Sequence, residues 1–205
     1  MRLYIVRHGK SEGNLRGVHQ TPEEKLSEAG LAQARLIAQR FSDITIDKII
    51  SSSHKRAEET AIAISEIVKQ PVILSNLFTE IKRPSSIIGK GENETAEVRA
   101  LIRSMWHDPN WRHSDEETFF ELRDRGIKGL QYILSLNSDN VLLVSHGILI
   151  DILLSLMIYG NNLEPKQFEP ILKFFHMENT GLTLFEYNDG HWRIVTWNDQ
   201  AHLGG

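Results

Sequence analysis

Short apolar runs alternate with amphipathic segments along most of the chain. A short apolar run bounded by polar residues predicts a buried strand, whereas apolar positions three and four residues apart predict one face of a helix. The predicted strands are Leu3–Val6, Lys48–Ile50, Pro71–Leu74 and Val141–Val144. Strands that alternate with helices favour a mostly parallel sheet with helices on both faces.

Helical patterns follow the first, second and fourth of these strands. Ser27 is a favourable N-cap for a helix from Glu28 to about Arg40, because its hydroxyl can accept a hydrogen bond from the first turn. The apolar positions on one face of this helix are Leu31, Ala34, Ile37 and Ala38. Further helices are expected over Ala57–Val68 and Gly147–Tyr159.

Two segments depart from the alternation. Thr183–Tyr187 and Trp192–Trp197 flank an Asn-Asp-Gly-His turn, which predicts an antiparallel hairpin at one sheet edge. Leu77–Asp115 contains prolines, glycines, Trp106 and Trp111, and we interpret it as a loop-and-helix insertion over the site. A surface excursion with half-buried tryptophans is an equal alternative. The expected fold is a three-layer α/β sandwich in one domain, residues 1–205, with one antiparallel edge strand and a lid at about 77–115.

Composition narrows the functional classes. The chain has 205 residues and a net charge of −4, without a long run of like charges, so we expect neither nucleic-acid nor membrane binding. It has no cysteine, which excludes disulfides, thiolate metal sites and a cysteine nucleophile. Asp151 interrupts the most apolar late segment, and Arg2 and Arg7 leave no room for the apolar core of a signal peptide. We therefore expect a cytoplasmic protein.

Residues suited to phosphate chemistry follow each predicted strand. Arg7-His8-Gly9 follows the first, Arg56 opens the helix after the second, Glu80 comes shortly after the third, and Ser145-His146-Gly147 follows the fourth. The carboxyl ends of parallel strands meet at one edge of a sheet, so these residues can converge. A guanidinium group can bind an oxyanion through two donors, and an imidazole can attack phosphorus. The N-terminus of a helix, such as that at Gly147, attracts anions.

A metal site is the alternative use of His8 and His146. Neighbouring arginines would repel a cation, so we expect no metal and no cofactor at this site.

Five groups of residues, taken in order, resemble the histidine phosphatase superfamily, also called phosphoglycerate-mutase-like. The groups are Arg7-His8-Gly9 with Ser11 and Asn14; Leu26-Ser27 with Gly30 and Ala34; Ser51-Ser52 with Arg56-Ala57 and Thr60; Ser145-His146-Gly147; and Asn198-Asp199 with His202-Leu203. The resemblance runs nearly end to end, and only the lid from Lys82 to Asp115 matches little of the family.

The resemblance implies a role for each matching residue. His8 would be the nucleophile that becomes phosphohistidine, and Glu80 would be the general acid. The phosphoryl oxygens would be bound by Arg7, Arg56 and His146, with Asn14 contributing. The family needs no metal.

Some assignments rest on position. Glu80 is preferred over Glu92 and Glu94 because it lies nearest the third strand, although Ile81-Lys82-Arg83-Pro84 replaces the residues usual after the acid. Ser11, His54 and Arg83 are the candidate substrate contacts. The other histidines are expected to be surface or packing residues: His19, His107, His113, His176, His191 and His202.

The expected function is hydrolysis of a phosphomonoester through phosphohistidine, with a small phosphorylated substrate as the only required partner. A homodimer is compatible with the sequence. A cofactor-dependent phosphoglycerate mutase with the same site is the alternative enzyme, and a phosphate-binding regulatory protein with little turnover is the alternative outside enzymes. We favour hydrolysis because the chain is short and departs from the mutase-like pattern after Glu80.

Overall fold

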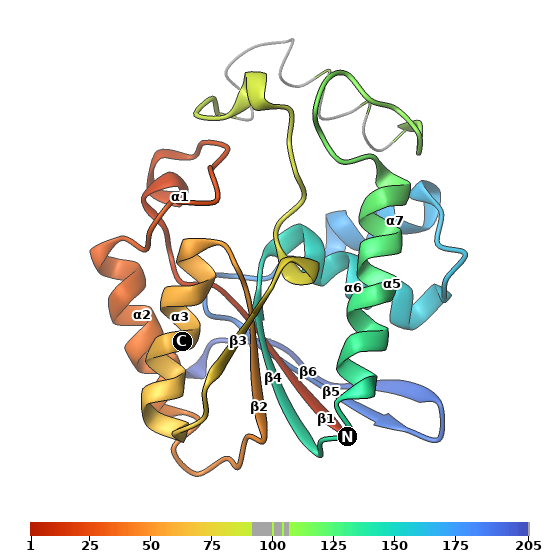
Figure 1. Ribbon diagram of the computed structural model, residues 1–205. Helices are drawn as coiled ribbons and strands as arrows, with labels where there is room; N and C mark the ends of the chain where they lie inside the picture. Colours follow the sequence, from red (N-terminus) through yellow and green to blue (C-terminus); the bar gives the residue numbers. More distant parts are fainter. Residues whose placement is uncertain (92–99, 101–103, 105–106, 205) are drawn as a thin grey trace.

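A six-stranded sheet forms the centre of the protein (Figure 1). The computed structural model describes residues 1–91, 100, 104 and 107–204. The strands are β1 (Arg2–Arg7), β2 (Lys48–Ser52), β3 (Val72–Ser75), β4 (Asn140–Ser145), β5 (Leu182–Asn188) and β6 (His191–Asp199). In the order β3-β2-β4-β1-β5-β6, the first four strands are parallel, β5 is antiparallel to β1, and β6 is antiparallel to β5. The predicted mostly parallel sheet and its C-terminal hairpin are confirmed.

Helices cover both faces of this sheet. They are α1 (Glu12–Arg16), α2 (Glu28–Gln39), α3 (Lys55–Val68), α5 (Phe119–Ser135), α6 (Gly147–Tyr159) and α7 (Pro165–Phe174), with short 3-10 helices η1 (Asn76–Phe78), η2 (Ser85–Ile87) and η3 (Ala201–Leu203). Figure 1 shows α2 and α3 on one face and α5 and α6 on the other. The three-layer arrangement is therefore the predicted one.

The apolar run in β1 explains why both faces must be covered. Leu3 and Ile5 pack in the core beneath α5 and α6, whereas Tyr4 and Val6 pack in the core beneath α2 and α3. Successive side chains of a strand point to opposite faces, so a central strand with two buried faces is apolar throughout.

Two details of the helix predictions need correction. Leu31 was placed on the buried face of α2, but it is 40% exposed, and Gly30 occupies the buried position instead. Helices α5 and α7 were not predicted. Thr118 and Glu121 form a capping box at the start of α5, which is a signal that can be found in the sequence.

The segment expected to form a lid lies beyond the carboxyl ends of the parallel strands in Figure 1, as far as it is described. Its residues 89–91 bond to the loop after α1: Gly89 N–H donates to His19 O at 2.8 Å, and His19 N–H donates to Lys90 O at 3.0 Å. Trp111 is half-buried against the core, whereas Trp106 lies outside the described residues. The boundaries of the lid stay a prediction.

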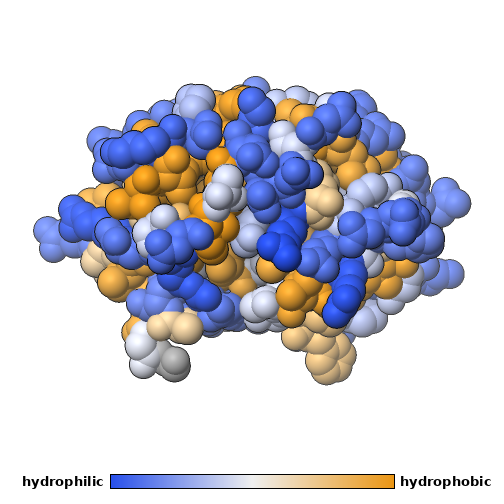
Figure 2. Space-filling model, turned by 90° about the horizontal axis from the view of Figure 1, so that it is seen from below, coloured by the Kyte–Doolittle hydropathy of each residue, from blue (hydrophilic) through white to orange (hydrophobic). Residues whose placement is uncertain are grey.

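The opposite end of the molecule, where β1 and β4 begin, carries interspersed hydrophilic and hydrophobic residues (Figure 2). A hollow of about 310 Å³ lies there among charged residues that include Arg2, Asp139 and Glu186. No helix within the described residues is long and apolar enough to span a bilayer.

Gly30 sets how closely α2 approaches the loop after β1. A Cβ at this position would lie 1.9 Å from the carbonyl oxygen of Lys10, which itself accepts bonds from the N–H and hydroxyl of Ser27. Gly30→Ala should therefore lower the free energy of unfolding by about 1–3 kcal/mol, as overpacking does. Ala29→Ser adds an atom at the exposed neighbouring position and should change it by less than about 0.5 kcal/mol. Urea denaturation measures both, and equal stability of the two variants would contradict the expectation.

Candidate active site

A cavity of about 890 Å³ opens at the carboxyl ends of the parallel strands. The register aligns Arg7 of β1 with Ser145 of β4, and Ser52 of β2 with Ser75 of β3, so these strand ends share one edge. The predicted site residues that line the cavity are Arg7, His8, Asn14, His54, Arg56, Glu80, Arg83 and Gly147. The convergence expected from the sequence is thus observed.

The ring of His8 is held by one partner on each nitrogen. Its Nδ1 lies 2.7 Å from the carbonyl oxygen of Gly9, and its Nε2 lies 3.2 Å from Nε of Arg56. A carbonyl only accepts and a guanidinium only donates, so Nδ1 carries the proton and Nε2 carries the lone pair. Burial, followed by the positive charges of Arg56 and Arg7, keeps the pKa of His8 well below its usual value. His8 is therefore neutral and nucleophilic at Nε2.

The backbone around His8 is fixed by α3. Gly9 N–H donates to Oγ1 of Thr60 at 3.0 Å, and that hydroxyl donates to the carbonyl of Arg56 at 2.8 Å. The loop that carries the nucleophile is thus tied to the helix that carries its arginine.

Of the two site arginines, Arg56 is buried and Arg7 is partly buried, and each donates to a backbone carbonyl. Arg7 donates through Nη1 to the carbonyl of Met177, and its Nε has no partner. Arg56 donates through Nη1 to the carbonyl of Thr21 at 3.1 Å and through Nη2 to Nδ1 of His54 at 3.4 Å. Burial lowers the pKa of Arg56 to about 10, so the guanidinium keeps its charge at neutral pH. This end of the cavity is strongly positive.

His146 is fully buried at the N-terminus of α6 and does not itself line the cavity. Its Nε2 lies 2.8 Å from the hydroxyl of Ser52, and its Nδ1 has no partner. The ring centre lies 5.0 Å from those of both His8 and His54. Burial, followed by Arg56, lowers the pKa of His146 well below its usual value, so its ring is neutral.

Glu80 stands at the N-terminus of α6, where backbone N–H groups are free. Its carboxylate accepts from N–H of Ile81 at 3.0 Å, of Leu149 at 3.3 Å and of Ile148 at 3.4 Å. The helix terminus stabilises a carboxylate at this place. Glu92 and Glu94, the alternatives to Glu80, lie outside the described residues.

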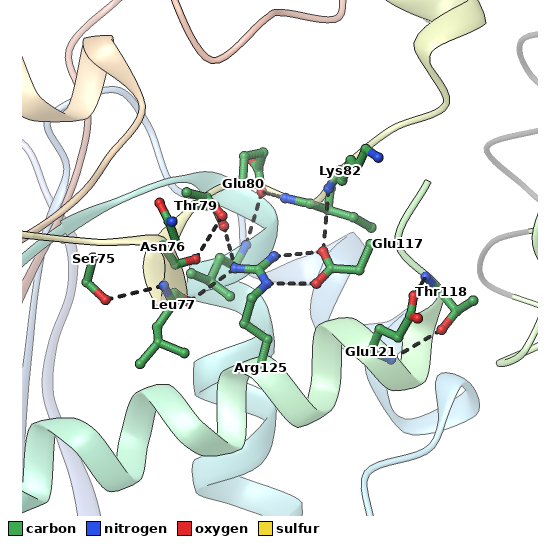
Figure 3. Close-up of polar contacts among 12 residues, drawn as sticks. Ser75, Asn76, Leu77, Thr79, Glu80, Lys82, Glu117, Thr118, Glu121 and Arg125 are labelled. Atoms are coloured by element: carbon green, nitrogen blue, oxygen red, sulfur yellow. Dashed lines mark hydrogen bonds and ion pairs between the residues drawn. The ribbon is translucent and has the colours of Figure 1, made fainter. Parts of the chain in front are cut away.

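An arginine clamp from α5 holds the segment before Glu80 (Figure 3). Arg125 Nη1 donates to the carbonyls of Leu77 at 3.1 Å and Thr79 at 2.8 Å, while Nε and Nη2 pair with Glu117 at 2.7 Å each. Because Arg125 belongs to an unpredicted helix, this positioning contact was missed in the sequence.

Ser11 differs from its predicted role as a substrate contact. It is fully buried, does not line the cavity, and caps α1 by accepting from Asn14 N–H at 3.1 Å. Its hydroxyl also lies 2.6 Å from Oε1 of Gln20. Ser11 therefore stabilises the short helix α1 that carries Asn14, because a helix N-terminus needs a side-chain acceptor.

The cavity is also lined by two histidines and an aspartate that were not predicted as site residues. His19 and His176 both line the cavity, and His176 is also exposed, as expected for a surface residue. Asp151 also lines it, is 6% exposed, and has no partner for Oδ1. Burial, followed by the charge of Glu80, raises the pKa of Asp151 to about 8. A single carboxyl in an otherwise apolar helix was the signal for it in the sequence.

The geometry suits transfer of a phosphoryl group to His8. Buried guanidinium groups can neutralise the phosphoryl oxygens, and a carboxyl near the cavity can protonate a leaving oxygen. Among the described residues, no three histidine, aspartate or glutamate side chains are grouped so that they could hold a metal ion.

Comparison with known proteins agrees with this geometry. The model of the histidine phosphatase superfamily (branch 1) matches residues 3–200. The uncharacterized phosphatase PhoE of Bacillus subtilis is 30% identical over 203 residues, which cover 98% of this chain and 96% of that protein. The probable phosphoglycerate mutase GpmB of Proteus mirabilis is 28% identical over 214 residues, covering 99% and 95%.

Among solved structures, mycobacterial glucosyl-3-phosphoglycerate phosphatase in complex with VO3 shares the fold with a TM-score of 0.82. It is 22% identical, and the match covers 97% of this chain and 99% of that one. Since the family model spans nearly the whole chain, the protein belongs to the histidine phosphatase superfamily, branch 1.

Proposed function

We propose that the protein hydrolyses phosphomonoesters of small metabolites through a phosphohistidine formed on His8. The observation that carries the proposal is the neutral His8 ring, whose Nε2 lies 3.2 Å from Nε of Arg56 and whose pKa is lowered by burial and by the charges of Arg56 and Arg7. The proposed substrate is small because it must enter a cavity of about 890 Å³, and the proposed location is the cytoplasm.

In the first step the phosphoryl group enters the positive end of the cavity. Arg56 releases Nε2 of His8 and turns its donors to the phosphoryl oxygens, together with Arg7. His8 Nε2 then forms a bond to phosphorus while the bond from phosphorus to the ester oxygen breaks. Glu80 gives a proton to that oxygen, and the alcohol leaves. Proton donation by a positioned general acid lets an alkoxide leave as the neutral alcohol.

In the second step water attacks the phosphorus. The bond between phosphorus and Nε2 breaks, Glu80 takes the proton of the water, and inorganic phosphate leaves with His8 again neutral. Asn14 is assigned a contact to the phosphoryl oxygens because it lines the cavity. His146, which does not line the cavity, is assigned a second contact because its ring centre lies 5.0 Å from that of His8 and its Nδ1 has no partner. Splitting the reaction in two lets a nitrogen nucleophile and a water act in turn at fixed positions.

A phosphoglycerate mutase is the second candidate, favoured by the likeness to GpmB over nearly the whole chain. It would form the same phosphohistidine but return the phosphoryl group to a second hydroxyl. Turnover of phosphoglycerate that requires a bisphosphoglycerate primer would support the mutase, whereas release of phosphate without a primer supports the hydrolase. A phosphate-binding protein with little turnover would release almost no product from a chromogenic phosphate ester.

His8→Ala should reduce turnover of nitrophenyl phosphate by at least roughly 10³-fold, because the proposal provides no other nucleophile. Phosphate release measures the rate, and labelled phosphate trapped on the unaltered enzyme should be labile in acid and stable in base. His191→Ala, in the exposed hairpin turn, is the matched control and should keep its activity. An acid-stable adduct would point to a different residue.

Chelation should leave activity intact, because arginines rather than a cation neutralise the phosphoryl charge. Phosphate release is measured after dialysis against excess EDTA, with the same treatment of a known zinc-dependent phosphatase as control. Loss of activity that added zinc or magnesium restores would contradict the proposal.

Glu80→Gln should slow hydrolysis of an alkyl phosphate far more than that of nitrophenyl phosphate. The alkoxide needs a proton to leave, whereas nitrophenolate leaves almost unaided, and general acids contribute ~10²–10⁴-fold. Glu66→Gln makes the same chemical change at an exposed position of α3 and should affect neither rate. If Glu80→Gln slows both esters equally, Glu80 has only a structural or binding role.

A further inference from the structure

One buried carboxyl in the cavity has no part in the chemistry described above. Asp151 is 6% exposed, lines the cavity, and its Oδ1 has no hydrogen-bond partner. Aspartate is almost never fully buried unless it is paired, because removing an ionised carboxyl from water is costly. An unsatisfied carboxyl in the wall of a cavity indicates a ligand group that bonds to it.

The position of Asp151 on α6 places it beside the reaction. Side chains on a helix tilt toward its N-terminus, so Asp151 lies over the same face as Gly147 and Ile148, one turn earlier, and all three line the cavity. Glu80 binds to the N–H groups of this first turn. A Cβ at Gly147 would lie 3.9 Å from the guanidinium of Arg7. Asp151 therefore faces the space between the general acid and the phosphate end.

The charges around Asp151 indicate the kind of group that it binds. Burial and the nearby Glu80 both raise the pKa of Asp151, while Arg7 opposes them. Because the pKa of Asp151 is raised to about 8, its carboxyl is mostly protonated at neutral pH without a ligand, and a cation bound beside it would favour the ionised form. A hydroxyl of a ligand would bond to the carboxyl of Asp151 but would not offset the charge of the nearby Glu80. An ammonium group would supply both the hydrogen bonds and the missing positive charge.

We propose that Asp151 binds a primary ammonium group of the leaving alcohol, so that the preferred substrates are phosphomonoesters of small amino alcohols. The inference rests on the proposed phosphatase function and deepens it. Arg7 and Arg56 bind the phosphoryl group, and Glu80 protonates the ester oxygen. Asp151 binds the ammonium group at the other end of the substrate. The leaving group is short, because Asp151 lies one helical turn from the residue that packs against Arg7.

The test compares four esters of similar size: 2-aminoethyl, 2-hydroxyethyl, propyl and carboxymethyl phosphate. In the unaltered enzyme kcat/KM for 2-aminoethyl phosphate should exceed that for each of the others by roughly 10-fold or more. In Asp151→Asn the ratio of kcat/KM for 2-aminoethyl over propyl phosphate should fall roughly 10- to 100-fold, as expected for loss of a charged hydrogen bond. Asp139→Asn removes a carboxylate at the far end of the sheet and should leave the ratio unchanged.

Several outcomes would overturn the inference. One is a preference of the unaltered enzyme for the hydroxyethyl, propyl or carboxymethyl ester, which needs no variant to be observed. Another is an equal loss on all four esters in Asp151→Asn, which would mean that Asp151 acts on Arg7 rather than on the leaving group.

Calorimetric binding of the same esters to His8→Ala separates this inference from the proposed function. Tighter binding of 2-aminoethyl phosphate supports the ammonium site even if no ester is hydrolysed, and equal binding of all four rejects it. Hydrolysis of propyl phosphate without an ammonium preference would uphold the phosphatase and reject the site.

Discussion

The site depends on two arginines, Arg7 and Arg56, whose guanidinium groups bond to carbonyls rather than to carboxylates. Within the described part of the chain neither Arg7 nor Arg56 forms an ion pair; each bonds instead to a backbone carbonyl, of Met177 and Thr21 respectively. A carbonyl fixes the plane of the guanidinium without cancelling its charge. The positive charge thus stays available to a phosphoryl group, and the same charge helps to keep His8 neutral. The charges of the same two arginines therefore explain both the anion-binding site and the neutral state of His8.

A third arginine shows the contrast. Arg125 also donates to two carbonyls, but Glu117 pairs with it through two bonds of 2.7 Å. Its charge is neutralised, and what remains is a rigid clamp on the segment before Glu80. The hydroxyl of Ser145 fixes the same segment by donating to the carbonyl of Phe78 at 2.8 Å. The carboxyl that must donate a proton is therefore placed by α5 and β4 together, and preorganisation of this kind is what positions a general acid.

The sequence predicted which residues meet at the strand ends, but not the contacts that hold Glu80, for a physical reason. His8, Arg56 and Gly147 follow apolar strands directly, so a parallel sheet alone brings them together. The contact by which α5 holds the segment before Glu80 could not be predicted from the sequence, because Arg125 is far along the chain from Leu77 and Thr79. Ser11 shows a different limit: a hydroxyl beside a catalytic loop is compatible with both substrate binding and helix capping, and only the geometry decides.

Asp151 extends this argument to specificity. The residues to which we assign the phosphoryl chemistry lie at or shortly after the strand ends, where the sheet allows little displacement. The other wall of the cavity comes from a helix face, from the segment that includes Ile81 and Arg83, and from the end of α7 at His176. These positions do not set the register of the sheet, so a side chain there can change without moving His8 or its arginines. A carboxyl at position 151 selects for charge in the leaving alcohol while the phosphoryl chemistry stays the same. The fold therefore places recognition of the phosphoryl group and recognition of the alcohol on different elements.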